Sequence, residues 1–152
     1  MLNHLYLIVH DVEGLPAGAY VFHRDRQALE LLKEGNFRRE AGYLGLEEEL
    51  PADASVNVYV LADLPRIVER FGNRGYRATQ LEAGIIGGKL YLSAYAQRLG
   101  ATGLTFYDDD VTAFLSARRA PIYCSMPTTR WTGSPGGKRR CGAPRKRTAQ
   151  SC

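Results

Sequence analysis

The chain has 152 residues, of which 24% are charged and 45% hydrophobic, and a net charge of +4. This composition is ordinary for a globular protein, and the length suits one domain with its own core. No apolar run approaches the ~20 residues that a membrane-spanning helix needs, and the N-terminus lacks a signal-peptide pattern. These features argue against a membrane protein, and we expect a cytoplasmic location.

The positive charge is concentrated near the C-terminus. Residues 125–152 carry seven Lys or Arg and no acidic residue, so subtracting this +7 from the net +4 leaves −3 for residues 1–124. The segment is rich in Gly, Pro, Ser and Arg, and it has too few aliphatic residues to offset the entropy of ordering. We therefore predict one domain over residues 1–124 and a basic disordered tail over residues 125–152.

This tail is open to three interpretations: a solubilising extension, an arm for weak non-specific nucleic-acid binding, and a segment translated out of frame. Basic clusters neutralise phosphates, but Trp131 is the tail's one aromatic residue, so base stacking has little support. Binding through the tail would be steeply salt-dependent and lost on deleting residues 125–152. We favour the out-of-frame hypothesis, because acid-free Arg-, Gly- and Pro-rich sequence is typical of a shifted frame in GC-rich DNA. Cys124, Cys141 and Cys152 match no zinc or disulfide pattern.

Short apolar segments and turn residues predict several elements along the first half of the chain. Asn36 is placed to cap a helix, and Asp63, Pro65 and Gly72 have the spacing of a helix start and stop. Residues 55–61 alternate valines with other residues that are partly apolar, which favours a strand inside a sheet. The elements expected from these patterns are strands over 5–9, 19–23, 29–33 and 55–61 and helices over 37–44 and 64–71.

One long helix is predicted to be the centre of the fold. Apolar residues and Gly88 recur at three- and four-residue steps and define one helix face, expected to be the packed one. Gly100 follows as the expected C-cap, and residues 73–75 are expected to link this helix to the preceding one. The face consists of Ala78, Leu81, Ile85, Gly88, Leu92, Tyr95 and Leu99.

Glycines inside this helix need an explanation. Gly84, Gly87 and Gly88 each cost roughly 0.5–1 kcal/mol relative to Ala. Close approach of a partner helix, of another backbone or of a flat ligand would offset this cost, and a helix contact at a dimer interface is the simplest interpretation. The segment does not form a phosphate-binding loop, because Ala83 and Leu90 occupy positions that the Walker pattern requires to be Gly and Ser or Thr.

Residues 102–106 predict a short strand, and Asp108 or Asp109 is expected to open a helix through Leu115. Residues 108–110 are more simply helix-capping acids than a cation site. Residues 121–124 are compatible with a last strand.

Three histidines are expected at the surface or in hairpins, and two arginines beside the long helix either form a solvated basic face or meet an anionic ligand. These residues are His4, His10, His23, Arg74 and Arg77.

The segments 12–20, 29–35 and 81–109 resemble the nitroreductase superfamily, most closely its SagB-type dehydrogenases. The most specific part is Leu81-Glu-Ala-Gly84 with Leu90-Tyr-Leu92, Leu99-Gly100 and Gly103-Leu-Thr-Phe-Tyr-Asp-Asp109. The resemblance implies an α+β fold: a mixed or antiparallel sheet packed with helices around the long helix, as an incomplete domain. It also implies that the protein binds FMN and forms a homodimer. The residues implied beside the isoalloxazine ring are Gly103, Leu104, Thr105 and Phe106. The implied reaction is hydride transfer from NAD(P)H through the flavin to a small-molecule or peptide acceptor.

The sequence departs from the family at several points. Family members begin earlier, with an Arg- and Ser-containing segment that grips the FMN phosphate, and no counterpart is expected here. SagB-type proteins often carry His, Gln and Asn where this chain has Ile85, Gly87 and Gly88, which argues against peptide dehydrogenation. No catalytic acid or base and no metal ligand is nominated. The competing hypothesis is a truncated, non-catalytic relative that serves as a binding or remnant protein.

Overall fold

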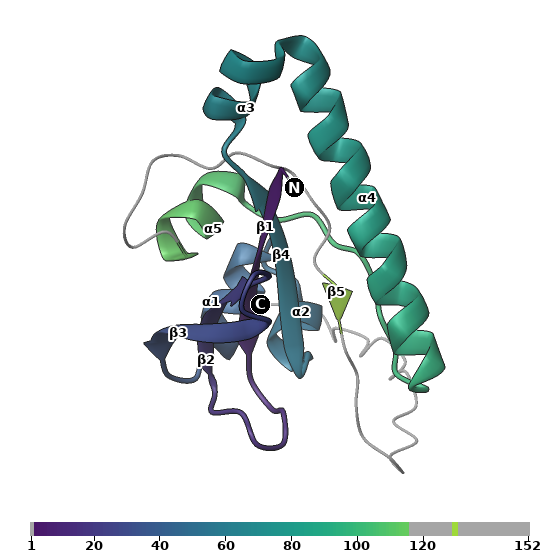
Figure 1. Cartoon of the computed structure of the whole chain (residues 1–152). Helices are drawn as coiled ribbons and strands as arrows, with labels where there is room; N and C mark the ends of the chain where they lie inside the picture. Colours follow the sequence, from purple (N-terminus) through teal and green to yellow (C-terminus); the bar gives the residue numbers. More distant parts are fainter. Residues whose placement is uncertain (1, 116–128, 131–152) are drawn as a thin grey trace, which may run out of the picture.

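A computed structural model describes residues 2–115 and 129–130 (Figure 1). The elements follow the chain in the order β1 (Asn3–Val9), β2 (Gly18–His23), β3 (Ala28–Glu34), α1 (Arg38–Leu44), α2 (Glu49–Asp53), β4 (Val56–Ala62), α3 (Leu64–Phe71), α4 (Asn73–Ala96), α5 (Asp108–Leu115) and β5 (Thr129–Arg130). Among these described residues, no helix is long and apolar enough to cross a membrane.

The strands form one antiparallel sheet in the order β3-β2-β1-β4-β5, which confirms the expected α+β class. β1 is the middle strand and pairs with β4 along its whole length, from Asn3 opposite Ala62 to Val9 opposite Val56. β4 is buried from Asn57 to Ala62, as predicted for a strand inside the sheet.

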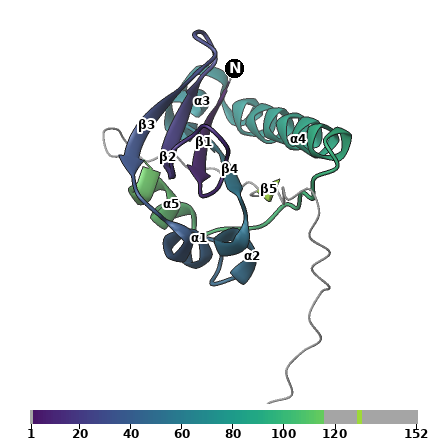
Figure 2. The same ribbon diagram turned by 90° about the horizontal axis from the view of Figure 1, so that it is seen from below.

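Helices cover both faces of this sheet (Figure 2). α4 lies along one face, where the Asn3 side chain of β1 donates to the Thr79 carbonyl at 3.0 Å. On the opposite face, Asn57 of β4 donates to the Pro51 carbonyl of α2 at 2.9 Å, and α1 and α5 pack nearby. The core therefore extends from the sheet to the helices on each side.

The signals for α3 are confirmed residue by residue. The Asp63 carboxylate accepts the Arg66 N–H at 3.3 Å, Pro65 lies in the first turn, and Gly72 follows the last turn with a φ of 61°. The expected Asn36 cap of α1 was wrong: the N-cap residue is Phe37, which makes no side-chain capping hydrogen bond, and Asn36, one residue earlier, accepts the Arg38 N–H at 3.2 Å. Side-chain capping thus fixes the start of α3 but not that of α1.

Three predictions about α4 were wrong. The helix begins at Asn73, so residues 73–75 are its first turn rather than a linker. It ends at Ala96, and the left-handed residue after it is Arg98, with a φ of 59°, rather than Gly100. The predicted packed face is largely exposed, whereas the residues buried against the protein are Gly75, Thr79, Ala83, Ile86 and Ala94.

Residues 102–106 form an irregular segment rather than the predicted strand, because they join no strand of the sheet. α2 was not predicted. The strand suggested at 121–124 lies outside the described residues, as does the proposed tail except for residues 129–130, which pair with Asn57 and Val58 of β4.

Candidate functional site

The connector between α4 and α5, residues 97–107, contains the residues expected beside a flavin. The Tyr107 N–H donates to the Leu44 carbonyl of α1 at 2.9 Å. Nearer the other end, the Gly103 N–H donates to the hydroxyl of Tyr91 on α4. The connector is therefore tied both to the long helix and to the helices on the opposite face of the sheet.

Phe106 points into the core. Its side chain is 4% exposed, and its ring makes an edge contact with Tyr59 of β4 at a centroid distance of 5.4 Å and an angle of 76°. Burial raises the pKa of Tyr59, so its hydroxyl stays protonated, and within the described structure this hydroxyl has no hydrogen-bond partner. Phe106 anchors the connector to the sheet.

The three preceding residues are less buried than Phe106. Gly103 and Leu104 are half-buried, and Thr105 is exposed. The four predicted flavin neighbours are thus contiguous but divided: Phe106 is part of the core, and residues 103–105 are accessible to a ligand. A flat ring could be supported by this segment, with backbone groups and a small hydroxyl side chain as its polar contacts.

The exposed face of α4 is a second feature of the site region. Leu92 is 73% and Tyr95 85% exposed, and Leu81 and Ile85 are more than half exposed. A Cβ atom added at Gly84, Gly87 or Gly88 would meet no atom within 4 Å. We call this surface the α4 apolar face; it comprises Leu81, Gly84, Ile85, Gly88, Leu92 and Tyr95. The sequence periodicity identified all of these residues except Gly84, and it predicted that their face would be packed against the rest of the protein.

Glu82 joins α4 to the beginning of β1. One of its carboxylate oxygens accepts the Leu2 N–H at 2.7 Å and both the N–H and the side-chain amide of Asn3 at 2.9 Å. Burial acts to raise the pKa of Glu82, but these hydrogen bonds lower it by more, and the net pKa lies below the ordinary value of 4.5. The carboxylate is therefore held ionised as a structural clamp.

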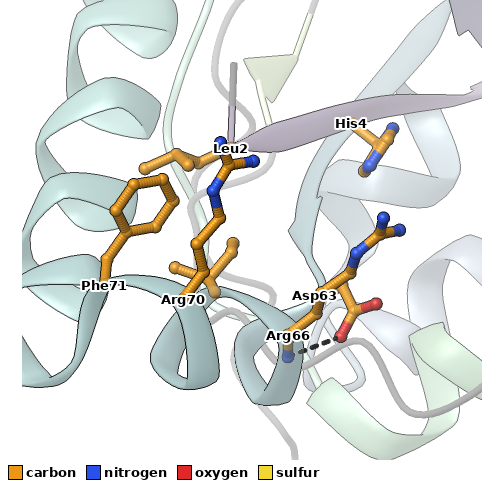
Figure 3. Close-up of a pocket in the computed structure, with 7 residues that line it drawn as sticks. Leu2, His4, Asp63, Arg66, Arg70 and Phe71 are labelled. Carbon is orange, nitrogen blue, oxygen red and sulfur yellow. Dashed lines mark hydrogen bonds between the residues drawn. The ribbon is translucent and has the colours of Figure 1, made fainter.

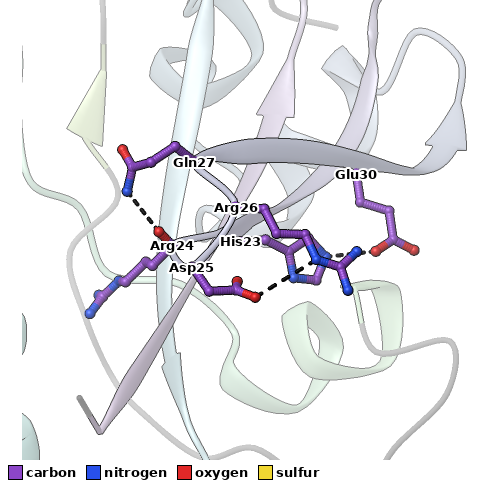
Figure 4. Close-up of polar contacts among 6 residues, drawn as sticks. All are labelled: His23, Arg24, Asp25, Arg26, Gln27 and Glu30. Atoms are coloured by element: carbon purple, nitrogen blue, oxygen red, sulfur yellow. Dashed lines mark hydrogen bonds and ion pairs between the residues drawn. The ribbon is translucent and has the colours of Figure 1, made fainter.

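The histidines do not gather at one site. His23 contacts Glu30 at 2.6 Å across the β2–β3 hairpin (Figure 4). The ring of His10 contacts the Ala54 carbonyl at 2.9 Å, and burial lowers its pKa. In the described part of the chain, no group of three or more His, Cys, Asp or Glu residues could hold a metal ion.

The charged residues singled out beside α4 and α5 have simpler roles. Arg74 and Arg77 are exposed, which favours the solvated basic face. Asp108 and Asp109 lie in the first turn of α5, where they complement the helix dipole, and burial raises the pKa of Asp108. Their neighbour Asp110 accepts the hydroxyl of Tyr43 at 2.9 Å.

Known proteins share both sequence and fold with this chain, although no family model matches it. A Methanocaldococcus jannaschii protein described as a "putative nitroreductase" is 26% identical over 127 residues, which are 83% of this chain and 64% of the relative. A crystal structure from Anabaena variabilis, described in the same words, is 32% identical, with a TM-score of 0.78 over 86% of this chain and 26% of that chain.

The Escherichia coli microcin synthetase McbBCD complex with truncated pro-MccB17 bound contains a chain of the same fold. Its TM-score is 0.71 at 18% identity, over 89% of this chain and 52% of that chain. The chain thus spans less than two thirds of the length of each relative.

The antiparallel sheet flanked by helices, with one long helix along a face, defines a nitroreductase-like α+β domain. The sequence and the fold of this chain are both similar to those of nitroreductase-superfamily proteins, of which it covers part of the length, as its sequence resemblance indicated.

Proposed function

We propose that this chain is part of an FMN-dependent oxidoreductase that transfers a hydride from NAD(P)H through the flavin to a small-molecule or peptide acceptor. The observation that supports this most strongly is the combination of 32% identity and a TM-score of 0.78 with the Anabaena nitroreductase-like structure. The acceptor class rests on resemblance, since the likeness to the microcin synthetase chain is one of fold.

In this proposal, Gly103, Leu104 and Thr105 lie beside the flavin ring, and Phe106 supports them from the core. A bound flavin would supply the hydride-accepting chemistry, and the protein would supply orientation and polarity. The half-buried Leu104 offers apolar contact, and the exposed Thr105 offers a hydroxyl. Phe106 is already packed against Tyr59, so its contribution is to hold the connector in place.

We further propose that the α4 apolar face pairs with a second copy of the chain. Four large side chains of this face are more than half exposed, and its helical glycines have open space around them. Burying such a surface would offset the propensity cost of the glycines. The hydrogen bond between Tyr91 and Gly103 ties α4 to the connector, so pairing through this helix would also affect the flavin side of the site.

FMN retention tests the proposal. The purified chain is mixed with excess FMN, passed through a desalting column and examined by visible absorption. We expect about one retained flavin per chain and strongly reduced retention by Leu104→Asp, because a carboxylate would replace apolar support for the ring. The matched control is Leu29→Asp on β3, a partly exposed leucine far along the chain from the connector.

A colourless wild-type protein, or equal retention by both variants, would remove the basis for this site. The first outcome would favour the second candidate function, a non-catalytic relative that serves as a binding or remnant protein. Fusing the chain to the flanking segments of a relative and measuring flavin retention again would separate the two candidates.

A further inference from the structure

A pocket lies between the beginning of β1 and one side of α3 (Figure 3). Its volume is about 220 Å³. Ligand sites for drug-sized molecules usually have about 300–1,000 Å³, so this pocket suits a smaller ligand or a single functional group. Its lining includes Leu2, His4, Asp63, Arg66, Arg70 and Phe71.

Two arginines give the pocket its chemistry. Arg66 and Arg70 are one turn apart on α3, and both side chains extend from the helix toward the start of β1 (Figure 3). Neither makes a salt bridge with any described residue. The Arg70 guanidinium lies 5.1 Å from the ring centroid of Phe71, a contact that leaves its N–H groups free to bind an acceptor.

The carboxylate in the lining does not neutralise this charge. Asp63 is bound to the Arg66 backbone N–H at 3.3 Å, where it caps α3. The lining thus contains one carboxylate and two guanidinium groups, and the net charge of these three groups is positive.

Arg24 adds a third positive charge at the same end of the sheet. It follows β2, whose last residues lie beside the first residues of β1. Both terminal nitrogens of its guanidinium are buried and have no hydrogen-bond partner in the described structure. Partial burial of the ring, followed by the charge of Arg24, lowers the pKa of His4 in the pocket wall. A buried cation without an acceptor is costly, so this end of the sheet favours an anion.

We propose that this pocket binds a small oxyanion, a phosphate or carboxylate group, through the guanidinium groups of Arg66 and Arg70. The planar guanidinium matches the geometry of such oxyanions and can donate two parallel hydrogen bonds to each. The site is separate from the Gly103–Thr105 connector and does not depend on flavin binding.

The test uses the full chain with inorganic phosphate as the probe, titrated against chloride at constant ionic strength and followed by amide chemical shifts. We expect saturable shifts in residues of α3 and the start of β1. The double variant Arg66→Gln, Arg70→Gln should bind phosphate roughly tenfold more weakly, because it loses both charge-assisted donors. The matched control, Arg139→Gln with Arg140→Gln, removes the same charge from the basic C-terminal segment and should leave these shifts unchanged.

Asp63→Asn gives a test in the opposite direction. Asparagine also caps helices well, so α3 should be preserved while one negative charge leaves the pocket. Phosphate should then bind about threefold more tightly, as expected for one partly exposed charge. Unchanged phosphate affinity in Asp63→Asn would contradict binding that depends on the charge of the pocket.

Absence of saturable shifts at α3, or equal weakening by the pocket variant and the control variant, would overturn the proposal. Competition arms identify the source of the oxyanion: displacement of phosphate by FMN but not by riboflavin would assign the site to a flavin phosphate, and displacement by acetate to a carboxylate ligand. Neither result depends on flavin retention at the connector, so this proposal and the proposed function can fail separately.

Discussion

At the scale of single residues, the Glu82 carboxylate joins α4 to the start of the chain. One carboxylate oxygen receives three N–H groups from the beginning of β1, and these hydrogen bonds hold the pKa of the carboxyl below 4.5. A carboxyl with a lowered folded-state pKa stabilises the fold above its unfolded pKa. That stabilisation is lost as the pH falls through the folded-state value.

We therefore expect Glu82→Gln to reduce the free energy of unfolding at pH 7 by about 1–2 kcal/mol, the range for hydrogen bonds to a charged group after allowing for partial solvent screening. Urea denaturation at pH 7 and at pH 3 measures the change. The difference between wild type and variant should shrink at the lower pH, because a larger fraction of the wild-type carboxyl groups is protonated there. A difference that stayed constant with pH would argue against an ionised clamp.

Substitution of glycine by alanine should have opposite effects on stability at Gly18 and at Gly84. A Cβ atom at Gly18 would lie 2.6 Å from the Lys33 carbonyl oxygen, whereas one at Gly84 would meet nothing within 4 Å. Gly18→Ala should cost about 1–3 kcal/mol through overpacking in the β2–β3 pair. Gly84→Ala should add roughly 0.5–1 kcal/mol through helix propensity. Urea denaturation at concentrations where the chain is monomeric compares the two, and stabilisation by Gly18→Ala would contradict the strand geometry.

At the scale of elements, α3 depends on its N-cap. Asp63→Ala removes the acceptor of the Arg66 N–H and should destabilise the protein by about 1 kcal/mol. Asp25→Ala in the hairpin is the control, since the 3.7 Å Asp25–Arg26 pair is largely exposed and contributes little. Chemical denaturation of both variants checks the prediction; equal effects would mean that the cap has no special role.

The elements differ in how much of them the sequence could predict. α3 was placed correctly because Asp63, Pro65 and Gly72 act within a few residues of one another. The strand expected at residues 102–106 was wrong, because a strand exists only if a partner lies beside it, and no local pattern supplies that information. The connector ends instead with Phe106 packed against Tyr59, a contact made across 47 positions of the sequence that only the fold reveals.

For α4, the periodicity correctly defined a face but not what covers it. Leu81, Ile85, Leu92 and Tyr95 repeat as core residues do, yet the core uses Thr79, Ala83 and Ile86 on another side. Alanine and threonine give a weak hydrophobic signal, so the side that packs on the sheet was not recognisable. For the candidate site, sequence resemblance pointed to Gly103–Phe106, but the clamp at Glu82 and the pocket beside α3 required three-dimensional neighbours.

At the scale of the whole molecule, we expect a homodimer through the α4 apolar face. Ile85→Glu would place a charge in the contact and should shift the chain from dimer to monomer while its far-ultraviolet circular dichroism stays unchanged. Val68→Glu on α3 changes another partly exposed aliphatic residue and should leave the dimer intact. Light scattering after size-exclusion chromatography measures the mass, and a dimeric Ile85→Glu protein would exclude this face.

The Glu82 clamp also bears on how the chain assembles. Its partners Leu2 and Asn3 precede it by 80 and 79 residues, so forming the clamp closes a loop that includes most of the described domain. Closing a flexible loop of this length costs about 4 kcal/mol of entropy, whereas the β2–β3 hairpin closes over a few residues. We therefore expect the hairpin to form early in folding and the docking of α4 on β1 to come late, after β4 has joined the sheet.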